Sequence, residues 1–159
     1  MKSAVGFVSP MLAKLVRTLP EGAEWEYELK LDGYRLEAVK PNDKVRLYSR
    51  RGNDFTKKFA RIAKQVENIK ADSFMIDGEA VVVDERGVPS FQMLQNRASL
   101  PRGWALAYYA FDLLDLDGHD LMVRPLTSRR NSLRGLSSDT VLTALIPAVA
   151  GSAHSCWVR

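Results

Sequence analysis

The chain has 159 residues, of which 46% are apolar and 26% are charged, as expected of one globular domain or a part of a larger one. Its net charge of +4 favours an anionic partner only weakly, since many basic proteins of this size bind no nucleic acid. The single cysteine, Cys156, excludes an internal disulfide and a cysteine-rich zinc site. The chain start has no signal-peptide core and no run approaches the roughly 18 apolar residues of a membrane span, so we expect a cytoplasmic protein without a membrane partner.

The residue pattern of the N-terminal quarter predicts a short helix or turn followed by a first strand. Residues 9–19 begin with a serine and a proline, which suit the first positions of a helix. From 25 to 31 apolar and polar residues alternate with the period of a half-buried strand, and Glu28 and Lys30 share its polar face. Asp32-Gly33 then predicts a tight turn into the next strand.

Two further strands, 34–40 and 45–49, complete a predicted antiparallel meander. A helix ending near Asn68 follows, with Asp54 or Thr56 as its N-cap and an apolar stripe on one side. The other side of this helix carries four basic residues, for which a solvated surface is favoured over contact with a DNA backbone. These residues are Lys57, Lys58, Arg61 and Lys64.

The second half of the chain predicts two longer strands and two helices. The expected elements are a strand over 74–83 interrupted at 77–79, a turn at 84–87, a short helix over 91–97, a buried strand over 104–114, a turn at 115–118 and a helix from Ser128 to about Arg134 capped by Thr127. The two isolated histidines suggest no metal site. The predicted fold class is α+β, a mainly antiparallel sheet with packed helices.

Lys30 is the first candidate for chemistry. A lysine without context is most often a solvated surface residue. To act as a nucleophile its amine must be neutral, although the free side chain has a pKa of about 10.4. Desolvation or nearby cations lower that pKa, and Arg35 follows the turn closely enough to help.

The segment from Lys30 to Arg35 resembles the nucleotidyltransferase motif of ATP-dependent DNA ligases, a lysine followed by x-Asp-Gly-x-Arg. Other segments resemble further parts of that family in the same order, particularly in the bacterial members tied to end joining. They are Pro10-Met11-Leu12-Ala13, Ser49-Arg50-Arg51-Gly52, Asp77-Gly78-Glu79-Ala80-Val81, Arg97 and Tyr108-Tyr109-Ala110-Phe111-Asp112-Leu113-Leu114. The resemblance covers residues 8–136 and implies the nucleotidyltransferase core of the family.

The resemblance also implies a role for individual residues. Lys30 would attack the α-phosphate of ATP, and Glu28 would line the adenine pocket. Phe111 would stack on the adenine and Glu79 would accept a hydrogen bond from the ribose. Two arginines, Arg35 and Arg50, would hold phosphate or ribose oxygens and later the 5′-phosphate of a nick.

Mg²⁺ is an expected cofactor beside ATP, and its ligands cannot be assigned from the sequence, although Asp112 and Glu79 are candidates. The expected partners are nicked or broken double-stranded DNA and end-joining proteins. Alternatives are a related RNA ligase or mRNA-capping enzyme, for which transfer of GMP from GTP would be diagnostic, and a module that binds nucleotide without catalysis.

The sequence departs from the family in its last part. The later Glu-Gly-x-x-x-Lys and Lys-x-Lys motifs of ligases are missing, and no lysine follows Lys70. We therefore expect a partial adenylation domain over 8–136, an atypical tail over 137–159 and no OB-fold domain. We also expect little self-adenylation by this chain, a partly open sheet and an edge prone to aggregation.

Overall fold

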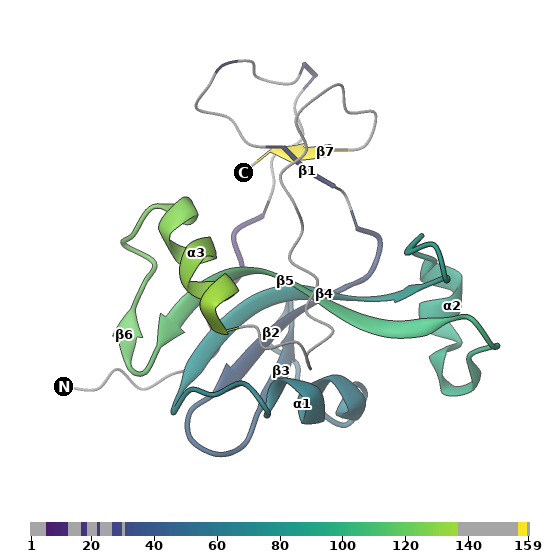
Figure 1. The fold of residues 1–159 in the computed structure, drawn as a ribbon, viewed down its shortest axis with the longest axis horizontal. Helices are drawn as coiled ribbons and strands as arrows, with labels where there is room; N and C mark the ends of the chain where they lie inside the picture. Colours follow the sequence, from purple (N-terminus) through teal and green to yellow (C-terminus); the bar gives the residue numbers. More distant parts are fainter. Residues whose placement is uncertain are drawn as a thin grey trace.

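The computed structural model describes residues 6–12, 17–18, 22, 27–29, 31–136 and 156–158. Its centre is a five-stranded antiparallel sheet with the strand order β3-β2-β4-β5-β6, and a separate pair is formed by β1 and β7 (Figure 1). The elements are β1 (Tyr27–Leu29), β2 (Tyr34–Lys40), β3 (Arg46–Ser49), α1 (Ala60–Val66), β4 (Phe74–Val83), α2 (Phe91–Gln95), the 3₁₀ helix η1 (Arg97–Ser99), β5 (Ala105–Leu116), β6 (His119–Asp120), α3 (Leu126–Leu136) and β7 (Cys156–Val158). The predicted α+β class is confirmed.

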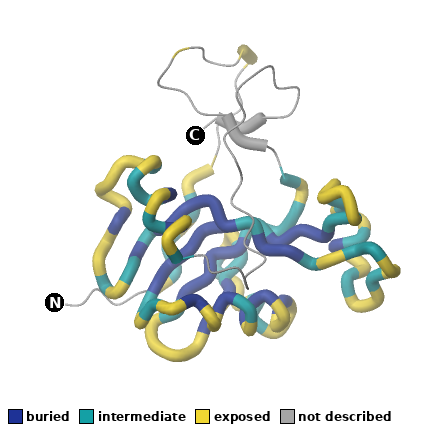
Figure 2. The backbone as a smooth tube through the Cα atoms, viewed as in Figure 1, coloured by how far each residue is buried: buried dark blue, intermediate teal, exposed yellow. Residues whose placement is uncertain are grey.

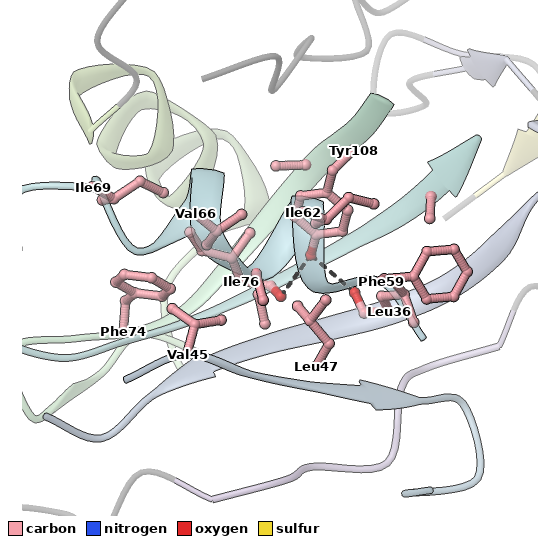
Figure 3. Close-up of a cluster of buried hydrophobic side chains, with 14 of the residues drawn as sticks. Leu36, Val45, Leu47, Phe59, Ile62, Val66, Ile69, Phe74, Ile76 and Tyr108 are labelled. Carbon is pink, nitrogen blue, oxygen red and sulfur yellow. Dashed lines mark hydrogen bonds between the residues drawn. The ribbon is translucent and has the colours of Figure 1, made fainter. Parts of the chain in front are cut away.

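One face of the sheet forms the apolar core. Alternate residues of β2 and β4 point to this face together with Tyr108, Ala110 and Leu113 of β5, and α1 supplies Ile62 and Val66 (Figure 3). The hydroxyl of Tyr108 is fully enclosed there and donates to the carbonyls of Leu36 and Ile76 at 2.9 and 3.1 Å. Burial raises the pKa of Tyr108 well above its usual value, so the hydroxyl keeps the proton that it donates. Figure 2 shows the buried strands between exposed loops and helix surfaces.

The predicted hairpin between the first two strands is wrong. β1 pairs with β7, whereas β2 pairs with β3 and β4 in the other sheet. Gly33 does not adopt the positive φ that a primed hairpin turn requires. Its role is close packing, because a Cβ at Gly33 would lie 2.3 Å from the carbonyl oxygen of Ala80. Gly33 therefore lets the chain pass close to β4.

α1 begins later than predicted. The Asp54 carboxylate accepts from the Thr56 amide at 2.8 Å, which closes a local turn before the helix starts at Ala60. Lys58, one of the four basic residues, lies 4.0 Å from the centre of the Tyr34 ring and 4.4 Å from that of Phe55. Its ammonium therefore makes cation–π contacts within the domain.

β4 is continuous over ten residues, so the predicted interruption at 77–79 is wrong. Gly78 belongs to the ladder, where it pairs with Leu36 and Ala110, and a Cβ there would lie 2.5 Å from the Tyr108 ring. The irregularities fall in β5, where two register shifts leave Phe111 and Leu114 as extra residues. The turn from β5 to β6 has positive φ at Asp117 and Gly118, as a type I′ hairpin requires.

α3 starts at Leu126, before the predicted cap Thr127, and packs against β5. The short β6 pairs only with the end of β5, and among the described residues no strand pairs with the outer side of β5 before Leu114. Residues 9–12 carry no helix, and the rest of the helix predicted over 9–19 lies largely outside the described residues. No helix in the described ranges is long and apolar enough to cross a bilayer.

Candidate functional site

The face of the sheet opposite the apolar core, called the charged face below, carries a cluster of charged side chains among buried apolar ones such as Val81. Strand register places its residues in two rows that cross three strands: one row consists of Arg35, Glu79 and Tyr109, and the next consists of Glu37, Asp77 and Asp112. All three carboxyl residues of the second row are at most 5% exposed. Buried carboxylates require cations or protons to offset their charge, so this row governs the electrostatics of the site.

Arg35 neutralises the middle carboxylate of that row. Its Nε lies 2.6 Å from Asp77 Oδ1 and its Nη2 lies 2.5 Å from Oδ2, a two-pronged ion pair in which Asp77 is buried. The same guanidinium lies over the ring of Phe111, with its Cζ 4.5 Å from the ring centre. Arg35 thus joins β2, β4 and β5 on the charged face. Its guanidinium carries five N–H donors, of which Asp77 accepts two.

Phe111 reaches the charged face because of the bulge in β5. In a regular strand Phe111 and Asp112 would point to opposite faces. Since Phe111 is the extra residue between the pairs Asp77–Asp112 and Gly78–Ala110, both side chains lie on the charged side. The local irregularity therefore places an aromatic ring among charged groups.

Asp112 is neutralised from outside the sheet. Arg129 of α3 donates from Nε to Oδ1 and from Nη2 to Oδ2, both at 2.8 Å, and its Nη1 donates to the carbonyl of Arg124 at 2.6 Å. The hydrogen bonds to Asp112 raise the pKa of Arg129. Because both oxygens of Asp112 are engaged, this residue is a poor candidate for the Mg²⁺ ligand that the sequence suggested.

Glu37 is the carboxyl of the row without a paired arginine. Its Oε1 accepts from the amide of Val8 at 2.9 Å, and its buried Oε2 has no hydrogen-bond partner among the residues that the structure describes. Burial raises its pKa from 4.5 to about 7; the Val8 hydrogen bond opposes this shift, and Asp77 adds to it. Glu37 therefore titrates close to neutrality.

The predicted site residues fall into three groups. Arg35, Glu79 and Phe111 come together on the charged face, where Glu79 is half-buried opposite Arg35. Arg50 is exposed in the turn after β3. Lys30 lies outside the described residues, as does the side chain of Glu28, whose backbone pairs with Trp157.

Sequence reasoning did not assign site roles to Glu37, Asp77 or Arg129. Asp77 lay within the acidic segment and could have been selected as the residue two before Glu79 on the same strand face. Glu37 and Arg129 belong to no recognised motif, and only strand register and the packing of α3 bring them to this face. In the described parts of the chain no group of three His, Cys, Asp or Glu is arranged to hold a metal ion.

Comparison of the fold first defines the class of protein. A solved structure described as mycobacterial DNA ligase D complexed with ATP and MES superposes with a TM-score of 0.64 at 35% identity, covering 80% of this chain and 41% of that one. The shared core is the curled antiparallel sheet with its packed helices.

Sequence comparison then defines the family. The family model described as ATP dependent DNA ligase domain matches residues 10–147, so the chain belongs to this family. The multifunctional non-homologous end joining protein LigD of Pseudomonas aeruginosa is 42% identical over 130 residues, which are 82% of this chain and 15% of that protein. LigD of Mycobacterium bovis is 38% identical over 138 residues, which are 86% of this chain and 18% of that protein. The chain thus spans less than a fifth of the length of these relatives.

Proposed function

We propose that this chain is the nucleoside-binding part of a ligase adenylation domain, and that Lys30 accepts AMP from ATP in the sealing of nicked or broken double-stranded DNA. The observation that carries the proposal is the charged face, where Arg35, Glu79 and Phe111 lie on three adjacent strands. A carboxylate, a guanidinium and an aromatic ring are groups that suit a ribose, a phosphate and a base.

The predicted nucleophile is close in sequence to a residue that packs on this face. A Cβ at Gly33 would lie 2.9 Å from Cγ of Glu79, so the motif's glycine touches the residue proposed to bind the ribose. Lys30 precedes Gly33 by three residues, and covalent geometry limits the distance between their Cα atoms to about 11 Å. Glu28, two residues earlier, is proposed to line the base pocket.

In the proposed reaction the neutral amine of Lys30 attacks the α-phosphorus of ATP. A P–N bond forms, the bond to the bridging oxygen breaks, pyrophosphate leaves with the electron pair, and the nitrogen releases one of its two protons to solvent. Arg35 and Arg50 offset the charge that spreads over the phosphate oxygens. Mg²⁺, held chiefly by those oxygens, would supply further positive charge. The proposal places the reaction in the cytoplasm, with end-joining proteins as candidate partners.

Intact-mass spectrometry after incubation with ATP and Mg²⁺ tests the assignment of Lys30, with Lys30→Ala as the matched variant. We expect only a minor fraction of the wild-type molecules to gain the mass of one AMP, because the later lysine motifs of the family are absent from this sequence. The gain should vanish in Lys30→Ala. A gain that persists in the variant would assign the nucleophile elsewhere, and full conversion would contradict the expected weak activity.

Calorimetric titration with ATP separates binding from chemistry. We expect the wild type and Lys30→Ala to bind ATP, since the base and ribose contacts do not depend on the amine. A folded wild-type protein that binds no ATP would refute the proposed nucleotide site.

A further inference from the structure

Two arginines are shared among three buried carboxyl groups on the charged face. Arg35 pairs with Asp77 and Arg129 pairs with Asp112, each through two N–H groups. Asp77 and Asp112 are direct cross-strand neighbours. Like charges this close repel each other strongly when they are buried, so each needs its own cation.

The Arg129–Asp112 pair leaves Asp77 as the carboxylate that Arg35 neutralises. While Arg129 satisfies Asp112, the Arg35 guanidinium stays on Asp77 and over the ring of Phe111, at 4.5 Å from its centre. Without Arg129, the carboxylate of Asp112 would lack its cation and would compete with Asp77 for Arg35. A shift of Arg35 toward Asp112 would alter the contact above the Phe111 ring.

α3 also holds the backbone at the bulge. Arg130, buried beside Arg129, donates from Nε to the carbonyl of Phe111 at 3.3 Å. Two consecutive arginines of α3 thus bind two consecutive residues of β5. Arg130 binds the backbone of Phe111, and Arg129 binds the side chain of Asp112. A bulge is a position at which a strand is re-aimed, so these contacts fix the direction of the ring.

We infer that Arg129 is a positioning residue of the nucleotide pocket: through Asp112 it fixes the Phe111 ring and the Arg35 guanidinium against which the adenosine of ATP binds. This inference rests on the proposed function. The Phe111 ring would contact only the base, whereas Arg35 shares the proposed phosphate contacts with Arg50, so loss of Arg129 should weaken binding of ATP more than binding of a bare triphosphate. A purely structural ion pair would affect both ligands alike.

The test compares Arg129→Lys with wild type by calorimetric titration of ATP and of inorganic triphosphate. Lysine keeps the charge but cannot form the two-pronged contact. We expect the Kd for ATP to rise about tenfold, the loss of roughly one charge-assisted hydrogen bond, and the Kd for triphosphate to rise by clearly less, because Arg50 is untouched and triphosphate makes no contact with the Phe111 ring. Arg124→Ala is the matched control: its side chain is exposed, and the backbone carbonyl that accepts from Arg129 remains.

Asp112→Asn provides a second variant should Arg129→Lys fail to fold by circular dichroism. Its amide keeps the acceptor for the Leu113 amide but removes the carboxylate charge, and we expect the same preferential loss of ATP affinity. Unchanged ATP affinity in a folded variant, or an equal loss for both ligands, would overturn the positioning role. A wild type that binds no ATP would instead refute the proposed function on which the inference rests.

Discussion

The two faces of the central sheet are built from alternate residues of the same three strands, yet they satisfy different physical requirements. Leu36, Ala38 and Ile76 fill one face beneath α1, and burial of their apolar surface needs only close packing. The other face buries Glu37, Asp77 and Asp112, which need cations, donors or protons.

The difference accounts for where the proposed ligand contacts lie. Apolar contacts tolerate substitution of similar volume, whereas a buried carboxylate fixes the identity of its partner. The charged face therefore carries both the proposed ligand contacts and the paired arginines that arrange them. Three substitutions, one on the middle carboxylate, one at the unpaired carboxyl and one on the apolar face, test this contrast.

Asp77→Ala should produce the largest loss of stability. It leaves the guanidinium of Arg35 largely buried without its carboxylate, and we expect the free energy of unfolding to fall by about 4 kcal/mol. Urea denaturation followed by circular dichroism measures the change. Arg86→Ala breaks the ion pair with Asp84 through a side chain that is 82% exposed, and should cost less than about 0.5 kcal/mol. Equal effects of the two substitutions would refute the special character of the charged face.

Glu37→Gln should change the dependence of stability on pH. Both states hold the proton below pH 4.5, but between pH 4.5 and about 7 the folded protein keeps a proton that the unfolded chain has released. The unfolded state then binds fewer protons, so the free energy of unfolding falls as pH rises, by up to about 3 kcal/mol for this group.

Urea titrations at pH 5 and pH 8 check this prediction, because glutamine does not titrate. The variant should gain stability relative to the wild type as the pH rises. A constant difference between the two proteins across that range would show that Glu37 does not carry the pH dependence.

Tyr108→Phe should have the smallest effect. It removes one hydroxyl that donates to two carbonyls on the apolar face, and we expect a loss of about 1.5 kcal/mol with ATP binding unchanged. Tyr109→Phe, at a half-buried position on the charged face, is the matched control; it should change the stability by less than about 0.5 kcal/mol. A loss as large as that of Asp77→Ala would erase the contrast between the faces.

Local sequence patterns predicted the main strands well. The strand over 34–40 is confirmed at both ends, and the turn at 115–118 is confirmed, with Asp117 and Gly118 at positive φ. These features depend on side-chain period and turn chemistry, which act over a few residues. Partner choice was predicted poorly: β1 pairs with β7, at the other end of the chain, rather than with β2.

Two glycines show why strand pairing could not be predicted from short sequence segments. Gly33 suggested a hairpin turn and Gly78 suggested a break in the strand, but both serve close approach to another strand. A glycine that permits a turn and one that admits a neighbour look identical in sequence. The candidate site has the same limit: Arg35, Glu79 and Phe111 were expected from motifs, whereas Arg129 was not, because its partner Asp112 is 17 residues away.

The sequence by itself determined the strand segments, the family resemblance and the residue types of the candidate site, since these are encoded in short motifs and alternation. Only the tertiary structure decided which carboxylate each arginine neutralises and where the Phe111 ring lies. The physical reason is that strand register, one bulge in β5 and the packing of α3 bring these charges together, and the strength of their interaction depends on separation and burial.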